Sequence, residues 1–426
     1  MRRRDILASG AAALLTGGAS PVQLAALFHG GGSPTLDLQF LTGTLDPRVT
    51  FTRASTATYF DATGTLQTAG NNVARFDYDP MTRLPRGLLI EEARTNSATN
   101  SGTPASWGTL TGATWTTTTV APDGGSSGTF LKEDASSGNH AVTVPATIAS
   151  ATSYTVSFFG KAGTRRYVVL TGGGLAGAGL TPSWDLTAGA DTSLGSNASF
   201  WHGIQALSNG WYRCWASWLT TNTTAFQIMM CAVVNNNNYI GDNASGMYLW
   251  GVQQETGAFS TSYIQTTSAA VTRATDFAST PTASWLNPIT GTLAVDTTIS
   301  GINAGAISRI ASISDGTTNN LFEFLETGAT QLAFQQVVGG VTTQRVLTSS
   351  MTTAAYRMAA TYSAGLQRSA LNGASFADLA GVGVPPMTAL TIGNRTDGIR
   401  PLTGYVRRVR YWNRALSNSE LQRATT

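Results

Sequence analysis

Residues 210–218, Gly-Trp-Tyr-Arg-Cys-Trp-Ala-Ser-Trp, place large aromatic rings at both odd and even positions. In a β-strand, alternate side chains point to opposite faces of the sheet. One face then carries Trp211, Arg213, Trp215 and Ser217. The other carries Tyr212, Cys214, Ala216 and Trp218, and we expect it to pack into a hydrophobic core. Such a strand belongs in a sheet with two occupied faces.

The polar composition favours an all-β protein. Charged residues make up only 12% of the chain, so most solvent-facing positions must be Ser, Thr, Asn, Gln and Gly. Hydroxylated surfaces suit sheets, whereas long surface helices normally carry Glu and Lys. A net charge of +3 is mild, and the arginines lack the clustering with stacking aromatics that nucleic-acid binding needs. Nucleic acid is therefore not an expected partner.

A chain of 426 residues exceeds what one core usually serves, and the pattern predicts two tandem jelly-roll or β-sandwich domains. The first covers residues 97–276, with strands expected at 154–160, 166–170, 211–219, 226–234 and 246–253. The second covers residues 277–426, where apolar residues alternate cleanly at 293–299, 332–338 and 356–362. A small β-rich block, residues 35–96, precedes both.

Local signals near the C-terminus are specific. Asn372-Gly373 predicts a tight hairpin. The apolar parity slips between Val406 and Val409, which predicts a β-bulge at Arg407-Arg408. Ser417 and Glu420 have the spacing of a helix capping box, and Leu416 and Leu421 that of a hydrophobic staple.

Residues 1–34 form an N-terminal segment with two interpretations. Arg2-Arg3-Arg4 followed by small apolar residues resembles a twin-arginine export signal, and the apolar stretch is too short to span a bilayer. Alternatively, Ser20-Pro21 starts a short helix that ends at Gly30-Gly31-Gly32 and serves as an uncleaved anchor. We favour the anchor, which predicts contact with other proteins through this segment.

Three stretches resemble known families. The turns and short strands of residues 41–59 and 76–96 are similar to a block near the N-termini of tailed-phage fibre and spike proteins. Gly-Trp-Tyr-Arg at 210–213 with Trp-Gly-Val-Gln-Gln-Glu at 250–255 resembles the carbohydrate-binding-module-like jelly roll of phage proteins. The closing segment 404–417 resembles the concanavalin A-like, laminin-G-type sandwich. These resemblances imply glycan binding, a virion location on a head spike or tail fibre, and a homo-oligomer.

Candidate ligand-binding residues lie in the first sandwich. Flat indoles can stack against sugar C–H faces, while arginine and amides bond hydroxyls or a carboxylate. The candidate glycan-binding residues are Trp201, His202, Trp211, Arg213, Trp215, Asn236, Asn237 and Tyr239. The alternative is that the indoles fill a gap between packed sheets and the Asn run is a solvated loop. Arg407, Arg408, Arg410 and Arg414 either attract acidic polysaccharide or form a solvated face.

Catalytic and metal signals are weak. Glu91-Glu92 and Glu323/Glu326 point to opposite faces of a strand, so neither pair suits glycoside hydrolysis, although Asp134, Asp185 and Glu255 could meet in space. No cofactor is expected; turns at Asp315 and Asp397 could lend oxygens to a structural calcium ion. A hairpin around residues 220–225 would make Cys214 and Cys231 cross-strand neighbours, either as thiols or as a disulfide.

The sequence therefore predicts a non-catalytic receptor-binding spike or fibre of a phage-like particle, including gene transfer agents, that adheres to host surface or capsular polysaccharide. The alternatives are an exported bacterial lectin in the periplasm or on the cell surface, a polysaccharide depolymerase, and a purely structural connector.

Overall fold

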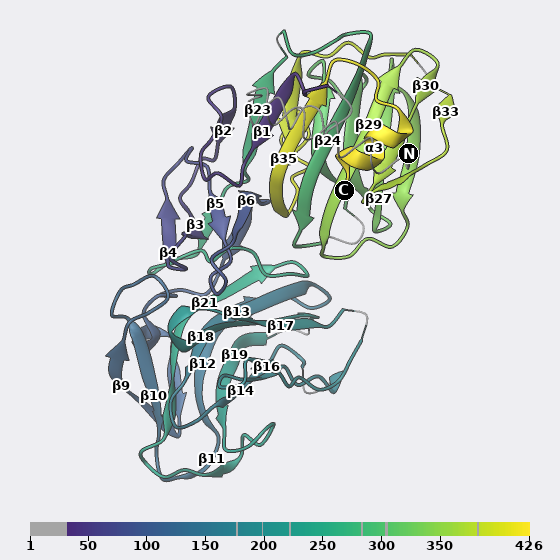
Figure 1. The fold of residues 1–426 in the computed structure, drawn as a ribbon. Helices are drawn as coiled ribbons and strands as arrows, with labels where there is room; N and C mark the ends of the chain where they lie inside the picture. The colour runs from purple at the N-terminus through teal and green to yellow at the C-terminus, as the bar shows by residue number, and fades with distance from the viewer. Residues whose placement is uncertain are drawn as a thin grey trace, which may run out of the picture.

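The computed structural model describes residues 32–175, 178–197, 199–220, 223–282, 284–302, 306–380 and 383–426. It confirms the all-β class, with the chain folded into two β-sandwich lobes (Figure 1). The predicted N-terminal anchor or signal lies outside these residues, apart from its last three positions. Within the described part of the chain, no helix is long and apolar enough to cross a lipid bilayer.

The lower lobe in Figure 1 is a jelly-roll-like sandwich of two six-stranded antiparallel sheets. The first sheet runs β17 (Trp201–Ala206), β18 (Trp211–Leu219), β13 (Ser153–Ala162), β21 (Gly246–Thr256), β10 (Gly128–Glu133) and β9 (Ala113–Thr119). The second runs β16 (Ala190–Asp191), β15 (Ser183–Asp185), β14 (Tyr167–Gly172), β19 (Thr223–Cys231), β12 (His140–Ile148) and β8 (Thr109–Thr111). Their facing sides enclose one core that includes Val156, Val168, Ile228 and Leu249. We call this lobe the jelly roll.

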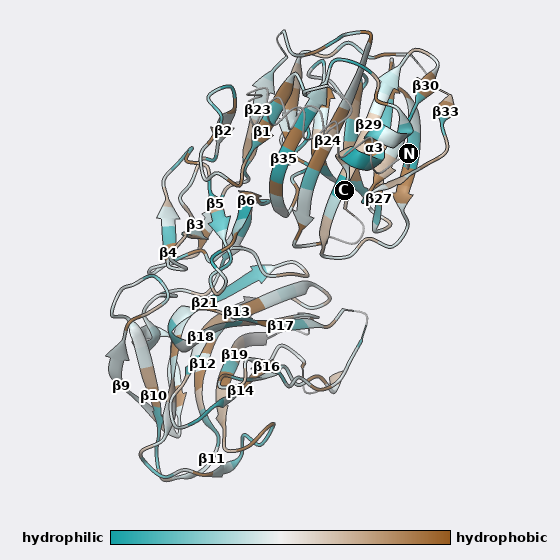
Figure 2. Cartoon of the chain, viewed as in Figure 1, coloured by the Kyte–Doolittle hydropathy of each residue, from teal (hydrophilic) through white to brown (hydrophobic). Residues whose placement is uncertain are grey.

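The upper lobe packs an eight-stranded sheet against a seven-stranded one. The larger sheet runs β32 (Ala374–Ser375), β31 (Ser369–Leu371), β29 (Ala355–Ser363), β24 (Thr290–Ile299), β35 (Gly404–Trp412), β6 (Pro85–Ile90) and β5 (Phe76–Tyr78), with β1 (Leu36–Gln39) also paired to β35. The smaller runs β2 (Thr50–Thr52), β23 (Phe277–Pro281), β34 (Ala389–Ile392), β25 (Ser308–Ser314), β26 (Leu321–Thr327), β27 (Gln331–Val338) and β28 (Val341–Thr348). We call this lobe the sandwich; hydrophobic and hydrophilic segments alternate along strands such as β24 and β35 (Figure 2).

The structure corrects the separate placement of residues 35–96. Strands β1, β5 and β6 lie in the same sheet as β35, and β2 pairs with β23, so these strands belong to the sandwich. The jelly roll is inserted between β7 (Arg94–Asn96) and β22 (Val271–Arg273), which pair antiparallel where the chain enters and leaves it. Short strands cannot cover a core alone, so these early strands bury their apolar faces in the larger sheets.

Several local predictions near the C-terminus are confirmed. Asn372 and Gly373 turn the chain from β31 to β32 with φ of 46° and 83°, as a two-residue hairpin requires. The register between β24 and β35 shifts at Arg407, which is the bulged residue. The helix α3 (Asn418–Ala424) starts with the complete Ser417/Glu420 capping box, and Leu416 and Leu421 are buried beside it.

The cysteine prediction is wrong. Cys214 lies on β18 in the first sheet of the jelly roll, whereas Cys231 lies on β19 in the second. The chain after β18 crosses to the opposite sheet instead of forming a hairpin. Both residues are buried thiols, and burial raises the pKa of Cys231 to about 12, so neither favours the reactive thiolate.

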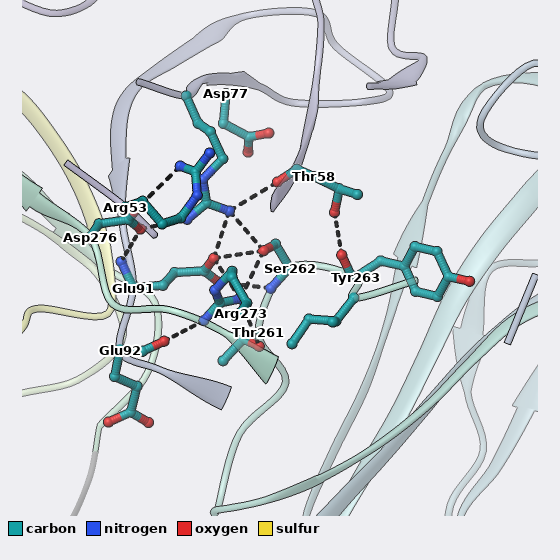
Figure 3. A network of polar contacts seen from close by, with 12 residues as sticks. Arg53, Thr58, Asp77, Glu91, Glu92, Thr261, Ser262, Tyr263, Arg273 and Asp276 are labelled. Atoms are coloured by element: carbon teal, nitrogen blue, oxygen red, sulfur yellow. Dashed lines mark hydrogen bonds and ion pairs between the residues drawn. The ribbon is translucent and has the colours of Figure 1, made fainter. Parts of the chain in front are cut away.

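A buried ion network joins the early strands to the segment that leaves the jelly roll (Figure 3). Asp276 pairs with Arg53 at 3.2 Å and with Arg75 at 2.5 Å, and Glu91 pairs with Arg75 at 2.8 Å and with Arg273 at 2.9 Å. None of these side chains is more than 4% exposed. Burial alone would raise the pKa of Glu91, but the guanidiniums of Arg273 and Arg75 lower it to about 2.

Replacement of the carboxylate in Glu91→Gln should lower the free energy of unfolding by about 3–5 kcal/mol at pH 7, because two buried guanidiniums lose their anion. The pKa of Glu91 falls from its ordinary 4.5 to about 2 on folding, so the stabilisation is complete above pH 4.5 and is lost as the pH falls toward 2. Urea unfolding measured from pH 2 to pH 7 should show a free energy of unfolding that falls toward acid pH in the native protein. The part of this fall that comes from Glu91 should be missing in Glu91→Gln.

The neighbouring Glu92→Gln is the matched control. Its side chain is 23% exposed and pairs with Arg94, so its loss should cost less than about 1 kcal/mol. Equal stability of Glu91→Gln and the native protein at pH 7 would contradict the role assigned to the network.

Candidate glycan-binding cleft between the lobes

The two faces of β18 are divided as the alternation predicts. Cys214, Ala216 and Trp218 are buried in the core of the jelly roll, and Tyr212 packs against it. The opposite face of β18 points away from this core, toward the rest of the chain. The side chains that face the core are therefore structural. A ligand can be contacted only by side chains on the opposite face of β18.

Trp211 does not reach solvent, contrary to its predicted role as a sugar platform. It is 1% exposed and packs in a second cluster with Phe60, Leu66, Trp250 and Tyr263. Its indole N–H donates to the backbone carbonyl of Val120 at 2.9 Å. The cover comes from the hairpin of β3 (Ala57–Phe60) and β4 (Leu66–Ala69), together with the chain around Ala121. Trp211 is thus a core residue between the lobes.

Trp215 is half-buried and faces an open cleft. Gly203 lies directly opposite it on β17, and a Cβ atom at Gly203 would come within 2.3 Å of Trp215 Cζ2. The bare glycine therefore leaves the space that the indole occupies above β17. Trp201 lies two residues before Gly203 on β17, so it projects from the same face as Trp215 and is its diagonal neighbour. β17 is an edge strand, and Trp201 is 62% exposed. Trp201 and Trp215 therefore project from the same face of the sheet, and we call these two rings the aromatic platform.

Arg213 is only 8% exposed and borders the same cleft. It donates from Nη2 to Ser157 Oγ at 3.0 Å, and its guanidinium lies 5.5 Å from the centre of the Phe159 ring. Its Nε–H has no hydrogen-bond partner among the described residues. Burial lowers the pKa of Arg213, against the attraction of Glu255 and Glu91, but an arginine remains charged.

The cleft lies between the lobes and has a volume of about 750 Å³. We call it the interlobe cleft. Gln205, Arg213 and Trp215 line it from the jelly roll, and residues 259–263 line it from the segment that leaves the jelly roll. The sandwich contributes Arg86, Tyr405 and Arg407. Its size, and a lining that mixes polar side chains with aromatic rings, suit a small-molecule or sugar site.

Three carboxylates also line the interlobe cleft, and each is held by protein groups. Asp77 accepts from the Phe60 backbone N–H at 2.6 Å and from the Tyr405 hydroxyl at 2.9 Å. Asp79 accepts from Arg86 at 2.8 Å, and Glu91 belongs to the buried ion network. Burial raises the pKa of Asp77, although Arg86 and these two hydrogen bonds oppose the rise. The carboxylates therefore shape the wall of the cleft.

The remaining predicted residues lie elsewhere. His202 points to the other face of β17, where its Nδ1 is 2.6 Å from Asp191. Asn236 is exposed, and Asn237 donates to the sulfur of Met229. Tyr239 donates its hydroxyl to Glu133 at 2.7 Å in β20 (Tyr239–Ile240), which pairs with β11 (Ser137–Gly138) at the end of the jelly roll remote from the sandwich (Figure 1). The amide-rich loop and the platform are therefore two separate places.

Asp134, Asp185 and Glu255, the distant carboxylates considered in the sequence, are each held by different partners in the described structure. Asp185 is paired with Arg166, Glu255 accepts from Gln253 and Thr261, and Asp134 accepts from Ser136 in its own turn. Asp315 likewise bonds Thr317 and Asn320, and Asp397 pairs with Arg395. Across the described ranges, no group of three His, Cys, Asp or Glu side chains is placed to hold a metal ion.

Sequence reasoning missed the part of the cleft that the sandwich supplies. Arg86 and Tyr405 are far from β18 in sequence, and no local pattern links them to Trp215. Arg407 did carry a signal, because it is one of the four arginines whose sequence cluster either attracts acidic polysaccharide or forms a solvated face.

Comparison with known families agrees with the lectin-like fold of the upper lobe. Residues 256–422 match Laminin_G_3, the concanavalin A-like lectin/glucanases superfamily. Residues 256–422, which include most strands of the sandwich, are therefore a concanavalin A-like, laminin-G-type domain within an all-β protein. No curated protein sequence matches the chain.

Similar solved structures each cover about one third of the chain. The sialidase module CBM40 of Ruminococcus gnavus bound to α2,3-sialyllactose is 16% identical, with a TM-score of 0.29 over 33% of this chain and 84% of that one. A leech intramolecular trans-sialidase is 17% identical, with a TM-score of 0.29 over 33% and 23% of the two chains. A SAP-like pentraxin from Limulus polyphemus is 14% identical, with a TM-score of 0.25 over 31% and 68%.

The two indoles of one face should differ sharply in their effect on stability. Trp211→Ala should lower the free energy of unfolding by about 3–5 kcal/mol, because it empties a buried site between the lobes. Trp215→Ala should cost about 1 kcal/mol, because that ring already borders solvent. Urea titrations followed by circular dichroism measure both values. Similar losses for the two variants would contradict the different burial of the two rings.

Proposed function

We propose that the protein is a non-catalytic glycan-binding protein whose interlobe cleft holds a sugar against Trp215. The observation that carries the proposal is the half-buried Trp215 indole, which faces a cleft of about 750 Å³ beside arginine and amide donors. Indole faces stack on sugar C–H groups, and the surrounding polar groups fix the hydroxyls. The exposed Trp201 ring extends the platform toward the sheet edge.

The absence of catalysis is part of the proposal. The acids in the interlobe cleft are engaged by Arg86, Tyr405 or the buried ion network, which supports a structural role for them. A depolymerase would need two carboxylates facing each other across a bound sugar. Incubation of the purified protein with capsular polysaccharide distinguishes the two functions, because a depolymerase releases new reducing ends and a lectin does not. No resident cofactor is required for the proposed role.

The biological setting we propose is the head spike or tail fibre of a phage-like particle, where the protein adheres to host surface or capsular polysaccharide. The resemblance of residues 41–59 and 76–96 to fibre and spike proteins supports this setting. A homo-oligomer with several weak sites would gain avidity on a repeating polymer. Location by antibody labelling of purified particles tests the virion setting; recovery from the periplasm or cell surface alone would favour an exported lectin.

Replacement of Trp215 by alanine should weaken glycan binding about tenfold to thirtyfold, since a stacked aromatic anchor contributes about 2 kcal/mol. A glycan array with the full chain identifies the ligand, and calorimetry compares the variant with the native protein. The Gly203→Val variant should also weaken binding, because the new side chain displaces the indole while leaving it in the protein.

Trp115→Ala provides the matched control. Trp115 is another half-buried tryptophan, and it lies on β9 at the opposite edge of the same sheet, outside the interlobe cleft. The Trp115→Ala variant should bind glycan as the native protein does. Unchanged binding by Trp215→Ala would instead support a purely structural connector.

A further inference from the structure

Three arginines and three carboxylates line the interlobe cleft, and they differ in how they are paired. Asp77 and Asp79 are both within reach of Arg86, at 3.4 and 2.8 Å. Glu91 is neutralised from behind by Arg75 and Arg273. Once these pairs are formed, the arginines that remain on the cleft wall without an ion pair to a described residue are Arg213 and Arg407. The interlobe cleft therefore presents two guanidiniums that form no ion pair with a described residue.

Arg213 is an unusual residue to bury. A guanidinium has five N–H donors and stays charged, so its removal from water is costly unless an anion and hydrogen-bond acceptors replace the water. The described contacts of its guanidinium are the Ser157 hydroxyl and the Phe159 ring. The Glu255 carboxylate attracts it electrostatically, but that carboxylate accepts its hydrogen bonds from Gln253 and Thr261. Arg213 therefore lines the cleft with a guanidinium whose Nε–H has no hydrogen-bond partner among the described residues.

Arg407 lines the interlobe cleft on the same face of β35 as Tyr405, on either side of the buried Val406. In the pairing of β35 with β24, Arg408 lies opposite Asp296 and Val406 opposite Thr297, which leaves Arg407 as the extra residue of a β-bulge. Arg408 uses its side chain to bind Asp37 at 2.6 Å, whereas half-buried Arg407 forms no such pair with the described residues.

We propose that the interlobe cleft selects glycans that carry carboxylate groups, with Arg213 on the jelly-roll wall and Arg407 on the sandwich wall as the binding cations. The planar guanidinium matches a carboxylate with two parallel hydrogen bonds, which gives both strength and orientation. Trp215 supplies the stacking surface for the same sugar ring, and Gln205 supplies an amide for its hydroxyls. This inference rests on the proposed function and specifies its ligand class.

The test compares acidic polysaccharides with their carboxyl-reduced forms. Polygalacturonate, alginate and hyaluronan serve as probes, and reduction of each uronic acid to the neutral sugar removes the charge while retaining the backbone. The native full-length protein should bind at least one acidic polymer about tenfold to a hundredfold more tightly than its reduced form, the range expected for hydrogen bonds to a charged group. This preference should diminish as salt is added.

Charge-removing variants locate the preference. Arg213→Gln and Arg407→Gln should each weaken binding of the acidic polymer about tenfold and leave binding of the reduced polymer within about twofold. If the variant of the buried Arg213 folds poorly, Arg407→Gln still tests the inference. Arg407 is only half-buried, so its replacement should disturb folding less. Arg48→Gln removes the same charge at a side chain that is 46% exposed and outside the interlobe cleft, so it should bind as the native protein does.

The outcomes separate this inference from the proposed function. Equal binding of acidic and reduced polymers, or no binding of any of them, overturns carboxylate selection. If neutral glycans then bind the native protein and fail to bind Trp215→Ala, the glycan-binding function stands without the charge preference. A preference that is unchanged in Arg213→Gln and Arg407→Gln also overturns the assignment of these two cations. A glycan array with no bound glycan, acidic or neutral, overturns both proposals.

Discussion

Arg53, Arg75 and Arg273 share two carboxylates, Glu91 and Asp276, at the place where the lobes meet (Figure 3). These residues come from both sides of the inserted jelly roll in sequence, and Asp276 also accepts from the Glu91 backbone N–H at 2.9 Å. Burying five charged groups is costly, so the network is a poor source of net stability. Its geometry is demanding, however. If the segments that enter and leave the jelly roll shifted relative to each other, a guanidinium or a carboxylate would become unpaired. We interpret the network as the device that fixes how the lobes are joined.

The candidate glycan-binding site depends on that junction. With the segments that enter and leave the jelly roll held in place, the β3–β4 hairpin covers Trp211. The segment 259–263 lines the same cleft as Arg213. On this face of β18, Trp211 is buried under the hairpin, whereas Trp215 lines the interlobe cleft. Trp215 lies at the border, with Gly203 leaving room for its ring. A rigid scaffold of this kind restricts the rotamers of the aromatic platform before a ligand arrives, which reduces the entropy lost on binding.

The sequence predicted the parts of this structure that depend on local pattern. The bounds of β18, its two faces, the Asn372-Gly373 turn, the bulge at Arg407 and the Ser417 capping box all follow from side-chain periodicity or turn chemistry. Alternation shows that a strand has two occupied faces, but it does not identify what covers each one. The burial of Trp211, the sheet partners of residues 36–90 and the separation of Cys214 from Cys231 are set by contacts between distant segments. Those contacts carry no local signal.

Two local rules are broken in the interlobe cleft, and both exceptions favour a ligand. Arg213 is buried without an ion pair in the described structure, and the bulge at Arg407 interrupts an otherwise regular strand pairing. Selection for stability alone would favour an apolar residue at the first position and regular pairing at the second. A carboxylate-bearing sugar would satisfy both exceptions at once, because it replaces the water that Arg213 has lost and gives Arg407 a partner. Neutral sugars would explain Trp215 and Gly203, but they would leave Arg213 without a directly paired anion.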